Sequence, residues 1–462
     1  MESVNDNRWV ETKAFIEGVL KKTGVPGCSV GILHQGEILS AGFGVSNIEK
    51  GYSVSGDTLF QIGSITKTFT ATLAMKLVEE KKLDLHRPVR AYLPDFKVAD
   101  EAVSAEGTPY HLLTHSAGWD GDLFLDTGDG EDAIPKYIQR MATREQLMPP
   151  GEYFSYNNAG FAVLGGILEA VTQKRLEELH RANIIEPLGL GHVYLNAGEA
   201  ITHDFAVGHH PAPEGNVVAR PWRLQRAVLP MGGIITNVGD LLRYAQCYLA
   251  KGQTPDGKQV LQPETVAEMF APKVQINPED GTSVGYAWMR RDLEDGAILS
   301  HGGGTNGQIT QLSLLPERDF ALAIFTNSDK GGALIQEVQK FLLKTYLDID
   351  LDSPKAIEST PEQLATYAGT ARRPGFNVYT EMVGGCLVGL QEVTIGFPTE
   401  DDPPPPPGQP YRIGRCAEDR LIVLDGDGKG MPIDVFRDEA GKINYLRAGR
   451  MYRFTPKGDN PG

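Results

Sequence analysis

The chain has 462 residues, of which 41% are hydrophobic and 23% are charged, a composition typical of a globular protein with a sizeable core. Its formal net charge of −16 argues against nucleic acid and anionic membranes as partners, because both are bound through an excess of Lys and Arg. The length predicts one large domain with a smaller one, or one large domain with insertions.

Cysteine usage and the N-terminal segment both favour a cytoplasmic protein. The cysteines, Cys28, Cys247, Cys386 and Cys416, form no CxxC pair and are expected to be reduced and buried. The N-terminal segment has neither a basic start nor an apolar stretch, so no signal peptide is predicted. The longest apolar stretch, residues 159–171, is too short to span a bilayer.

The first part of the chain mixes helices and strands. Two strand-like runs, residues 28–33 and 38–45, are separated by a Gln-Gly turn and are expected to form a hairpin. The acidic, turn-rich segment 121–132 is expected to be a solvated surface loop. Apolar residues that recur on one face predict three helices, over residues 8–22, 65–81 and 157–180.

Short β-like runs return later, at residues 297–300, 311–315 and 321–325, and a Gly-rich turn is expected between the first two. A helix is predicted over residues 332–346. Strands near both ends of this region, with helices between them, predict a sheet built from both termini, covered by helices and carrying a helical insert.

The tail differs in character from the rest of the chain. Residues 347–361 are interpreted as a linker, and helical periodicity disappears beyond them. The pattern predicts a small all-β barrel or sandwich, with a rigid proline loop at residues 403–407. The expected strands are residues 376–379, 386–390, 393–397, 420–424, 434–437, 442–446 and 451–454.

The strongest chemical hypothesis starts from Ser64 and Lys67. Residues three apart on a helix share a face, so the hydroxyl and the amine can touch. A serine hydroxyl is a weak nucleophile until a base takes its proton. The ordinary lysine pKa of about 10.4 is too high for that role, but burial would lower it. Alone, the pair has an ordinary alternative, a helix cap and a surface lysine.

Two further segments complete the hypothesis. Tyr156 can relay a proton beside a lysine, and Asn158 can bind the lysine or a substrate carbonyl, although a capping asparagine is the ordinary alternative. The Gly304 N–H, together with the Ser64 N–H, is a candidate oxyanion hole. The ordinary alternative for this last segment is a glycine-rich turn. The candidate substrate-binding residues are Asn158, His301, Gly302, Gly303 and Gly304.

The order Ser64-x-x-Lys67, Tyr156-x-Asn158 and His301-Gly-Gly resembles the serine β-lactamase and penicillin-binding-protein superfamily. The similarity is greatest to the class C β-lactamase branch, with its family VIII carboxylesterases, D-aminopeptidases and DD-peptidases. Residues 60–63, Phe-Gln-Ile-Gly, and residues 111–118, which open with His-Leu-Leu-Thr-His, also resemble that branch. The tail, from residues 364–370 onward, resembles the lipocalin-like domain attached to some of these hydrolases.

The resemblance implies an α/β fold in two domains. Residues 1–350 would form a β-lactamase/transpeptidase-like domain, with an antiparallel sheet flanked by helices and an all-helical subdomain. Residues 351–462 would form a small lipocalin-like all-β barrel that shapes the active-site cleft. Ser64, Lys67 and Tyr156 would be the catalytic residues, with no metal and no organic cofactor.

One residue departs from the family pattern. Most β-lactamases have lysine where this chain has His301, and a histidine with an ordinary pKa of about 6.5 is mostly neutral at pH 7. Efficient β-lactam hydrolysis is therefore disfavoured, and a small-molecule or peptide substrate with an ester or amide bond is favoured. Acyl transfer to an amine, as in a peptide cyclase or transpeptidase, and a non-enzymatic binding module are the alternatives. Whether the protein is a homo-oligomer stays open.

Overall fold

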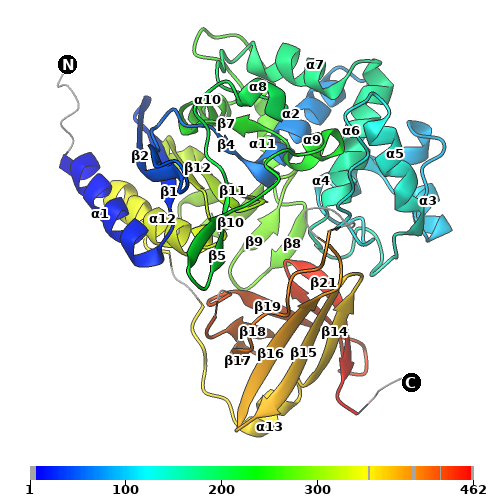
Figure 1. Ribbon diagram of the computed structural model, residues 1–462. Coiled ribbons are helices and arrows are strands. Elements are labelled where there is room, and N and C mark those ends of the chain that lie inside the picture. Colours follow the sequence, from blue (N-terminus) through cyan, green and yellow to red (C-terminus); the bar gives the residue numbers. More distant parts are fainter. Residues whose placement is uncertain (1–6, 352–353, 397–401, 427, 459–462) are drawn as a thin grey trace.

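A computed structural model describes residues 7–351, 354–396, 402–426 and 428–458. In Figure 1 the chain forms a large upper part, in which helices surround a sheet, and a smaller lower part made of strands. No helix among the described residues is long and apolar enough to cross a membrane.

The sheet of the large part joins the beginning of the chain to a segment near residue 320. Every neighbouring pair within it is antiparallel, and β1 (Gly27–His34) pairs with β13 (Phe320–Thr326) from Cys28↔Thr326 to His34↔Phe320. This confirms the sheet built from both termini. The strand order is β3-β2-β1-β13-β12-β11-β10-β9-β8. The other strands are β2 (Glu37–Asn47), β3 (Tyr52–Ser53), β8 (Val274–Asn277), β9 (Thr282–Val284), β10 (Met289–Leu293), β11 (Gly296–Thr305) and β12 (Gln308–Leu315).

Alternate residues of the sheet face two different cores, as the period of a strand requires. On β13, Leu322 and Ile324 pack with α1 (Asn7–Thr23) and α12 (Gly331–Leu347), while Ala323 and Phe325 pack into the larger core on the opposite face. Figure 1 shows α1 and α12 side by side against the sheet, and the rings of Phe15 and Phe341 stack between them. α10 (Val238–Leu249) covers the opposite face.

The helical insert is built around α2 (Thr66–Glu79), which is buried along nearly its whole length. The helix predicted over 157–180 is instead two helices, because Gln173 adopts a left-handed conformation with φ 55° and ends the first of them. The remaining helices are α3 (Glu101–Glu106), α4 (Pro109–Leu113), α5 (Ala133–Gln139), α6 (Asn158–Thr172), α7 (Leu176–His180), α8 (Ala197–Ala200), α9 (Leu229–Gly232) and α11 (Pro263–Phe270). Two small ribbons pair β4 (Phe60–Gln61) with β7 (Ile235–Thr236) and β5 (His209–Ala212) with β6 (Gly215–Val218).

The tail folds into a closed barrel of eight antiparallel strands, which confirms the prediction of a small all-β unit. The separate strand predicted over 393–397 is wrong where it is described, because Val393 ends β16 and residues 394–396 are not in a strand, whereas residue 397 lies outside the described residues. Two strands, β14 and β17, were not predicted. After α13 (Pro361–Ala365), the strands are β14 (Gly369–Arg373), β15 (Phe376–Val383), β16 (Cys386–Val393), β17 (Tyr411–Ala417), β18 (Arg420–Val423), β19 (Pro432–Arg437), β20 (Ile443–Ala448) and β21 (Arg450–Pro456).

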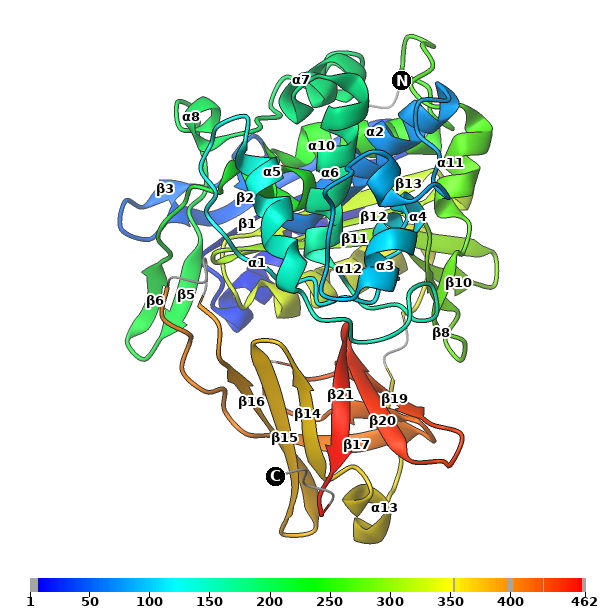
Figure 2. The ribbon, with the colours of Figure 1, turned by 90° about the vertical axis from the view of Figure 1, so that its right-hand side faces the viewer.

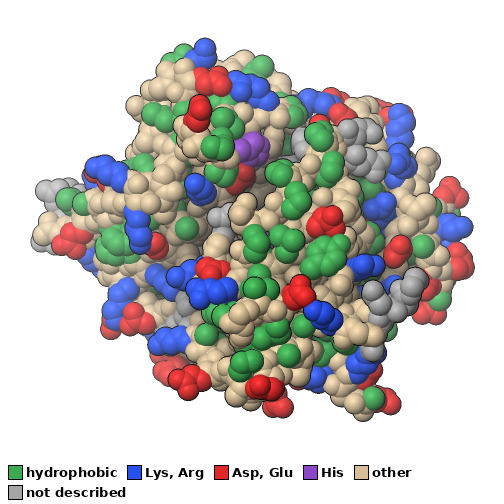
Figure 3. All heavy atoms as spheres, turned by 60° about the horizontal axis from the view of Figure 1, so that its bottom comes forward, with side chains coloured by type: hydrophobic (Ala, Val, Ile, Leu, Met, Phe, Trp, Pro, Cys, Tyr) green, Lys and Arg blue, Asp and Glu red, His purple; other side chains and the backbone are tan. Residues whose placement is uncertain are grey.

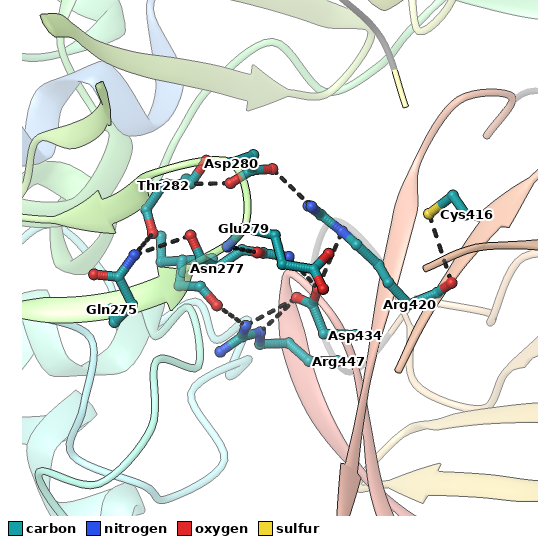
Figure 4. A network of polar contacts seen from close by, with 10 residues as sticks. Gln275, Asn277, Glu279, Asp280, Thr282, Cys416, Arg420, Asp434 and Arg447 are labelled. Atoms are coloured by element: carbon teal, nitrogen blue, oxygen red, sulfur yellow. Dashed lines mark hydrogen bonds and ion pairs between the residues drawn. The ribbon is translucent and has the colours of Figure 1, made fainter. Parts of the chain in front are cut away.

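The barrel is held against the large part by a polar network, drawn in Figure 4. Arg420 of the barrel pairs with Asp280 at 2.7 Å, and Arg447 pairs with Asp434 at 2.8 Å. Asp434 also accepts a hydrogen bond from Asn277 of β8 at 3.2 Å. Arg447 and Asp434 both belong to the barrel and are mostly buried, and Arg447 also donates to the Phe154 carbonyl of the large part at 3.4 Å. The two parts therefore meet in a specific, ordered contact.

The cysteines differ partly from expectation. Cys28 and Cys247 are buried free thiols, as predicted, but Cys416 is half-buried and Cys386 is exposed. Both departures lie in the barrel, where side chains alternate between the interior and the surface.

Candidate active site

Ser64 lies in a short 3-10 turn, Gly63–Ile65, that leads directly into α2. Gly63 has φ +51°, and a Cβ added there would lie 2.6 Å from the backbone nitrogen of Gly304. Only glycine tolerates this conformation and this close approach of β11. The turn therefore holds Ser64 where the sheet meets the helical insert.

Lys67 is fully buried one turn further along, and its Nζ lies 3.0 Å from the Ser64 Oγ. It also donates hydrogen bonds to the Asn158 Oδ1 at 2.8 Å and to the Met231 carbonyl at 2.7 Å. Burial lowers the pKa of Lys67 well below its usual value, and the nearby charge of Arg450 lowers it further, while Asp122 opposes the shift. The alternative of a surface lysine is excluded, and the neutral amine that a proton acceptor needs is favoured.

Asn158 is the first residue of α6, but it is not the residue that caps the helix. Asn157 is the cap, since its side chain accepts a hydrogen bond from the Gly160 N–H at 2.8 Å. The Asn158 side chain instead donates to the Asp122 Oδ1 at 2.9 Å while its own oxygen accepts from Lys67. These two contacts fix which end of the amide faces the lysine.

The prediction that 121–132 is a solvated loop is wrong at its N-terminal end. Asp122 is 4% exposed and is surrounded by charged partners from the barrel. Its carboxylate pairs with Arg450 at 2.5 Å and with Arg373 at 3.0 Å. Burial opposes ionisation of Asp122, but the two guanidinium groups outweigh it and hold its pKa below the usual value. The missing information was the position of the barrel, whose arginines turn this acidic segment inward.

Tyr156 lies beside the serine and the lysine. The nearby Ser64 hydroxyl favours ionisation of the Tyr156 phenol. Even so, among the described residues the phenol oxygen has no partner that meets the geometry of a hydrogen bond. Burial dominates and raises the pKa of Tyr156 far above its usual value, so the phenol is neutral at pH 7. The ring stacks on His115, with centroids 4.3 Å apart, and Lys67 Nζ lies 5.0 Å from its centroid. A neutral phenol here can relay a proton but is a poor base.

His301 and the glycines after it are part of β11, so the turn predicted between the two strands is present but shorter than expected, at residues 306–307. His301 and these glycines pair with β12 from His301↔Leu312 to Gly304↔Ile309, since glycine accepts extended backbone as readily as other conformations. His301 is buried, and its Nδ1 lies 2.6 Å from the Gly302 carbonyl. Burial lowers the pKa of His301 to about 3, with the charge of Lys67 adding to the effect, so this side chain is neutral at pH 7.

An alanine at position 303 is expected to destabilise the protein by about 1–3 kcal/mol and to impair the site. Its Cβ would overlap the Ile62 carbonyl oxygen and the Thr310 hydroxyl, and Ile62 immediately precedes the turn that carries Ser64. Gly302→Ala is the matched control, because its Cβ would come no closer than 3.3 Å, to the Gln311 side chain. Urea unfolding of both variants tests this; equal losses of stability would contradict it.

A cleft of about 870 Å³ opens at these residues, and both parts of the protein line it. Ser64, Tyr156 and the β11 glycines lie on one side, with Gly449 and Arg450 of the barrel among the other lining residues. The Tyr156 N–H donates to the Gly449 carbonyl at 3.0 Å, which fixes the tip of the β20–β21 hairpin at the site. Figure 2 shows this hairpin reaching from the barrel to the loops of the large part.

The sequence hypothesis missed Asp122 and Arg450. Arg450 donates to Asp122 at 3.0 Å, Asp122 accepts from Asn158, and Asn158 accepts from Lys67. A barrel residue is thus linked through two side chains to the amine beside Ser64. The Arg450 guanidinium also lies 5.0 Å from the centroid of the Tyr156 ring. The Gly449-Arg450 sequence carries a turn signal only, so no pattern pointed to this role.

The adjacent histidines His209 and His210 belong to the small ribbon of β5 and β6. They lie in β5, and His209 engages the backbone of Asn327 at 2.7 Å and of Ile48 at 3.3 Å through its two ring nitrogens. Across the described ranges, no group of three or more His, Cys, Asp or Glu side chains is arranged to hold a metal ion.

An antiparallel sheet beside a helical insert, with a serine and a buried lysine where they meet, defines a serine hydrolase-like protein. A family model described as Beta-lactamase matches residues 12–343. The chain belongs to the beta-lactamase family, which is a family of serine hydrolases, and the resemblance seen in its motifs is confirmed.

Relatives extend this similarity beyond the matched segment. Penicillin-binding protein 4 of Amycolatopsis lactamdurans is 30% identical over 365 residues, which cover 76% of this chain and 94% of that protein. The crystal structure of SurE superimposes with a TM-score of 0.73 at 23% identity, covering 97% of this chain and 99% of SurE. The octameric penicillin-binding protein homologue from Pyrococcus abyssi gives a TM-score of 0.63 at 22% identity, covering 97% and 100%. At these identities the two structures support the fold, barrel included.

Proposed function

We propose that this protein hydrolyses ester or amide bonds, including those of peptides and D-amino-acid derivatives, through an acyl-enzyme on Ser64. The observation that carries the proposal is the 3.0 Å contact between Ser64 and a fully buried Lys67 whose pKa is lowered well below its usual value. A neutral amine in this position can accept the serine proton.

The proposed reaction has two stages. Lys67 takes the proton of Ser64 as Oγ attacks the substrate carbonyl, and the backbone N–H groups of Ser64 and Gly304 stabilise the oxyanion. Tyr156 relays this proton from Lys67 to the leaving group, as the bond between the leaving group and the carbonyl carbon breaks. Lys67 then takes a proton from water, which attacks the acyl carbon, and returns that proton to the Ser64 Oγ as the acyl–oxygen bond breaks and the acid leaves. Asn158 orients Lys67 throughout, and His301 to Gly303 line the substrate cleft.

Neutral His301 supports the preference for esters and peptides over β-lactams, which we propose are at best weak substrates. A positive charge at position 301 would suit a substrate carboxylate, but the pKa of His301, about 3, leaves it uncharged at neutral pH. Arg450 brings a guanidinium to the cleft from the barrel instead, although Asp122 partly neutralises it.

Acyl transfer to an amine is the second candidate function. The size of the cleft favours it, since about 870 Å³ accommodates an acceptor as well as the acyl group on Ser64. Product analysis separates the candidates: hydrolysis yields a free acid, whereas a peptide cyclase or transpeptidase yields a cyclised or aminolysed product from the same acyl-enzyme.

The domain division at residues 350 and 351, and the description of the barrel as lipocalin-like, are part of this proposal. The support for this part is that the tail forms a closed eight-stranded barrel and that barrel residues line the cleft. We also propose a homo-oligomer, prompted by the octameric homologue from Pyrococcus abyssi. Light scattering coupled to size-exclusion chromatography would measure the assembly state directly, and a monomer would contradict this part.

The proposed function is tested by labelling. A fluorophosphonate probe, which reacts with activated serines, is expected to add once, and peptide mass spectrometry is expected to place the adduct on Ser64. The labelled protein should lose turnover of p-nitrophenyl esters and of D- and L-aminoacyl anilides. A labelled protein that retains full turnover of these substrates would overturn the assignment of Ser64.

A further inference from the structure

A second hollow lies inside the barrel. It measures about 880 Å³, and inward-facing side chains from alternate strand positions line it, such as Phe376, Val378 and Thr380 on β15. Protein interiors are normally close-packed, yet Phe376, Val378 and Tyr411 remain only partly buried although they border the barrel core. An eight-stranded barrel is wide enough either to be filled by its own side chains or to hold one small ligand, and this barrel is not filled.

The hollow is separate from the cleft at Ser64. Ser64, Tyr156 and His301 do not line it, and Arg450 is the one side chain, among the described residues, that borders both spaces. The lining is mainly apolar and extends beyond the barrel to His210, Arg220 and Asp329 of the large part. A ligand could therefore enter from the junction of the two parts without crossing the cleft. Figure 3 brings this barrel end of the molecule forward and shows hydrophobic side chains among charged ones over its surface.

One end of the hollow carries a buried arginine. The Arg373 side chain is 4% exposed, and its guanidinium carbon lies over the Phe376 ring, 3.6 Å from the ring centroid. It pairs with Asp122 at 3.0 Å and more weakly with Asp120 at 3.5 Å, but its Nε has no hydrogen-bond partner among the described residues. A buried donor without a partner costs free energy that an acceptor on a ligand would recover.

The charges around Arg373 leave room for an anion. Arg373, Arg450 and Arg144 face the two carboxylates of Asp120 and Asp122, so the cluster carries one excess positive charge when all are ionised. Burial and the charge of Asp122 raise the pKa of Asp120 to about 6, against the opposing effect of Arg373 and Arg144, which removes part of the negative charge near neutral pH.

We propose that the barrel is a second binding site, which takes a medium-chain aliphatic carboxylate with its chain along the apolar lining and its carboxylate at Arg373. The inference does not rest on the reaction at Ser64. A hollow of this volume falls in the range of small-molecule sites, in which a few charged or polar groups among apolar side chains orient the ligand.

Calorimetric titration of the full chain tests the proposal, with Ser64→Ala present to prevent any turnover. Decanoate is the probe, and decanol and decylamine are its uncharged and cationic counterparts. We expect saturable binding of one decanoate per chain, binding of decanol at least fivefold weaker and no saturable binding of decylamine. The same decanoate affinity is expected in protein whose Ser64 carries a fluorophosphonate adduct.

Two cavity-filling variants locate the site. Val378→Trp on β15 and Val393→Phe on β16 place bulk in the hollow, and each is expected to weaken decanoate binding at least tenfold. Val383→Trp is the matched control, because Val383 lies on the same strand with 57% of its surface exposed, and it should bind as the parent does. Absence of saturable decanoate binding, loss of binding on Ser64 labelling, or full affinity in both folded filling variants would overturn the proposal.

Discussion

Replacing Lys67 with methionine is expected to lower kcat/KM about 10³-fold on any ester or amide substrate that the wild-type protein turns over. Methionine keeps an unbranched side chain of similar length in the buried space, but it cannot accept the Ser64 proton. The Asn158 and Met231 oxygens that now accept hydrogen bonds from Nζ would lose that donor, so some loss of stability is expected as well. Steady-state kinetics and urea unfolding, measured together, separate the two effects.

Lys76→Met provides the control for this prediction. Lys76 lies on the same helix, α2, and its Nζ donates to the Val260 carbonyl at 3.3 Å, away from the residues around Ser64. The control should retain kcat/KM within about twofold. If Lys67→Met kept more than about a tenth of wild-type activity while folded, another group would have to accept the serine proton, and the proposed role of Lys67 would be abandoned.

Replacing Asp122 with asparagine is expected to lower the free energy of unfolding by about 3–5 kcal/mol at neutral pH. The substitution preserves shape but removes the negative charge between Arg373 and Arg450, leaving two guanidinium groups poorly compensated in a buried site. It also allows the amide at 122 to present a donor to Asn158, which would disturb the hydrogen bond that orients Lys67. Denaturant unfolding measures the loss.

The pH dependence of this loss has a definite sign. Because the folded-state pKa of Asp122 is depressed, its contribution to stability is fully present above the unfolded value of about 4 and disappears as pH falls through the folded value. The difference between wild type and Asp122→Asn should therefore be constant from about pH 7 to 8, above the titration of Asp120, and shrink in acid below about pH 4. Asp126→Asn, an exposed aspartate of the same segment paired with Arg223, should cost less than about 1 kcal/mol. Equal losses at positions 122 and 126 would contradict the buried cluster.

Sequence patterns predicted the parts of the site that depend on short range. Ser64 and Lys67 share one turn of a helix, so their contact follows from helical geometry once the helix is recognised. Tyr156, Asn158 and His301 were assembled through motif resemblance, and the structure brings them together around Lys67 and Ser64.

The patterns failed where contacts between distant parts of the chain determine the local structure. An acidic, turn-rich segment reads as a surface loop, because nothing within it indicates that two arginines from the far end of the chain will neutralise Asp122. The glycines after His301 were expected in a turn, because glycine is common in turns, yet they pair with β12, and at Gly303 the nearby Ile62 carbonyl leaves no room for a side chain. Strand positions in the barrel were recovered less completely for a similar reason: β14 is defined by its pairing with β21, which only the closed barrel provides.

The hairpin contact at Tyr156 has a consequence for how the protein is made. Ser64, Lys67, Asp122 and Tyr156 all leave the ribosome long before Gly449 and Arg450, which join them through the Gly449 carbonyl and the Asp122 carboxylate. During synthesis the Asp122 carboxylate therefore has no barrel arginine to pair with, and the Tyr156 N–H has no Gly449 carbonyl to bind, until those barrel residues have been made. A nascent chain can fold its sheet and helices while its serine stays poorly organised, so that full reactivity would arise only after translation has passed the last hairpin.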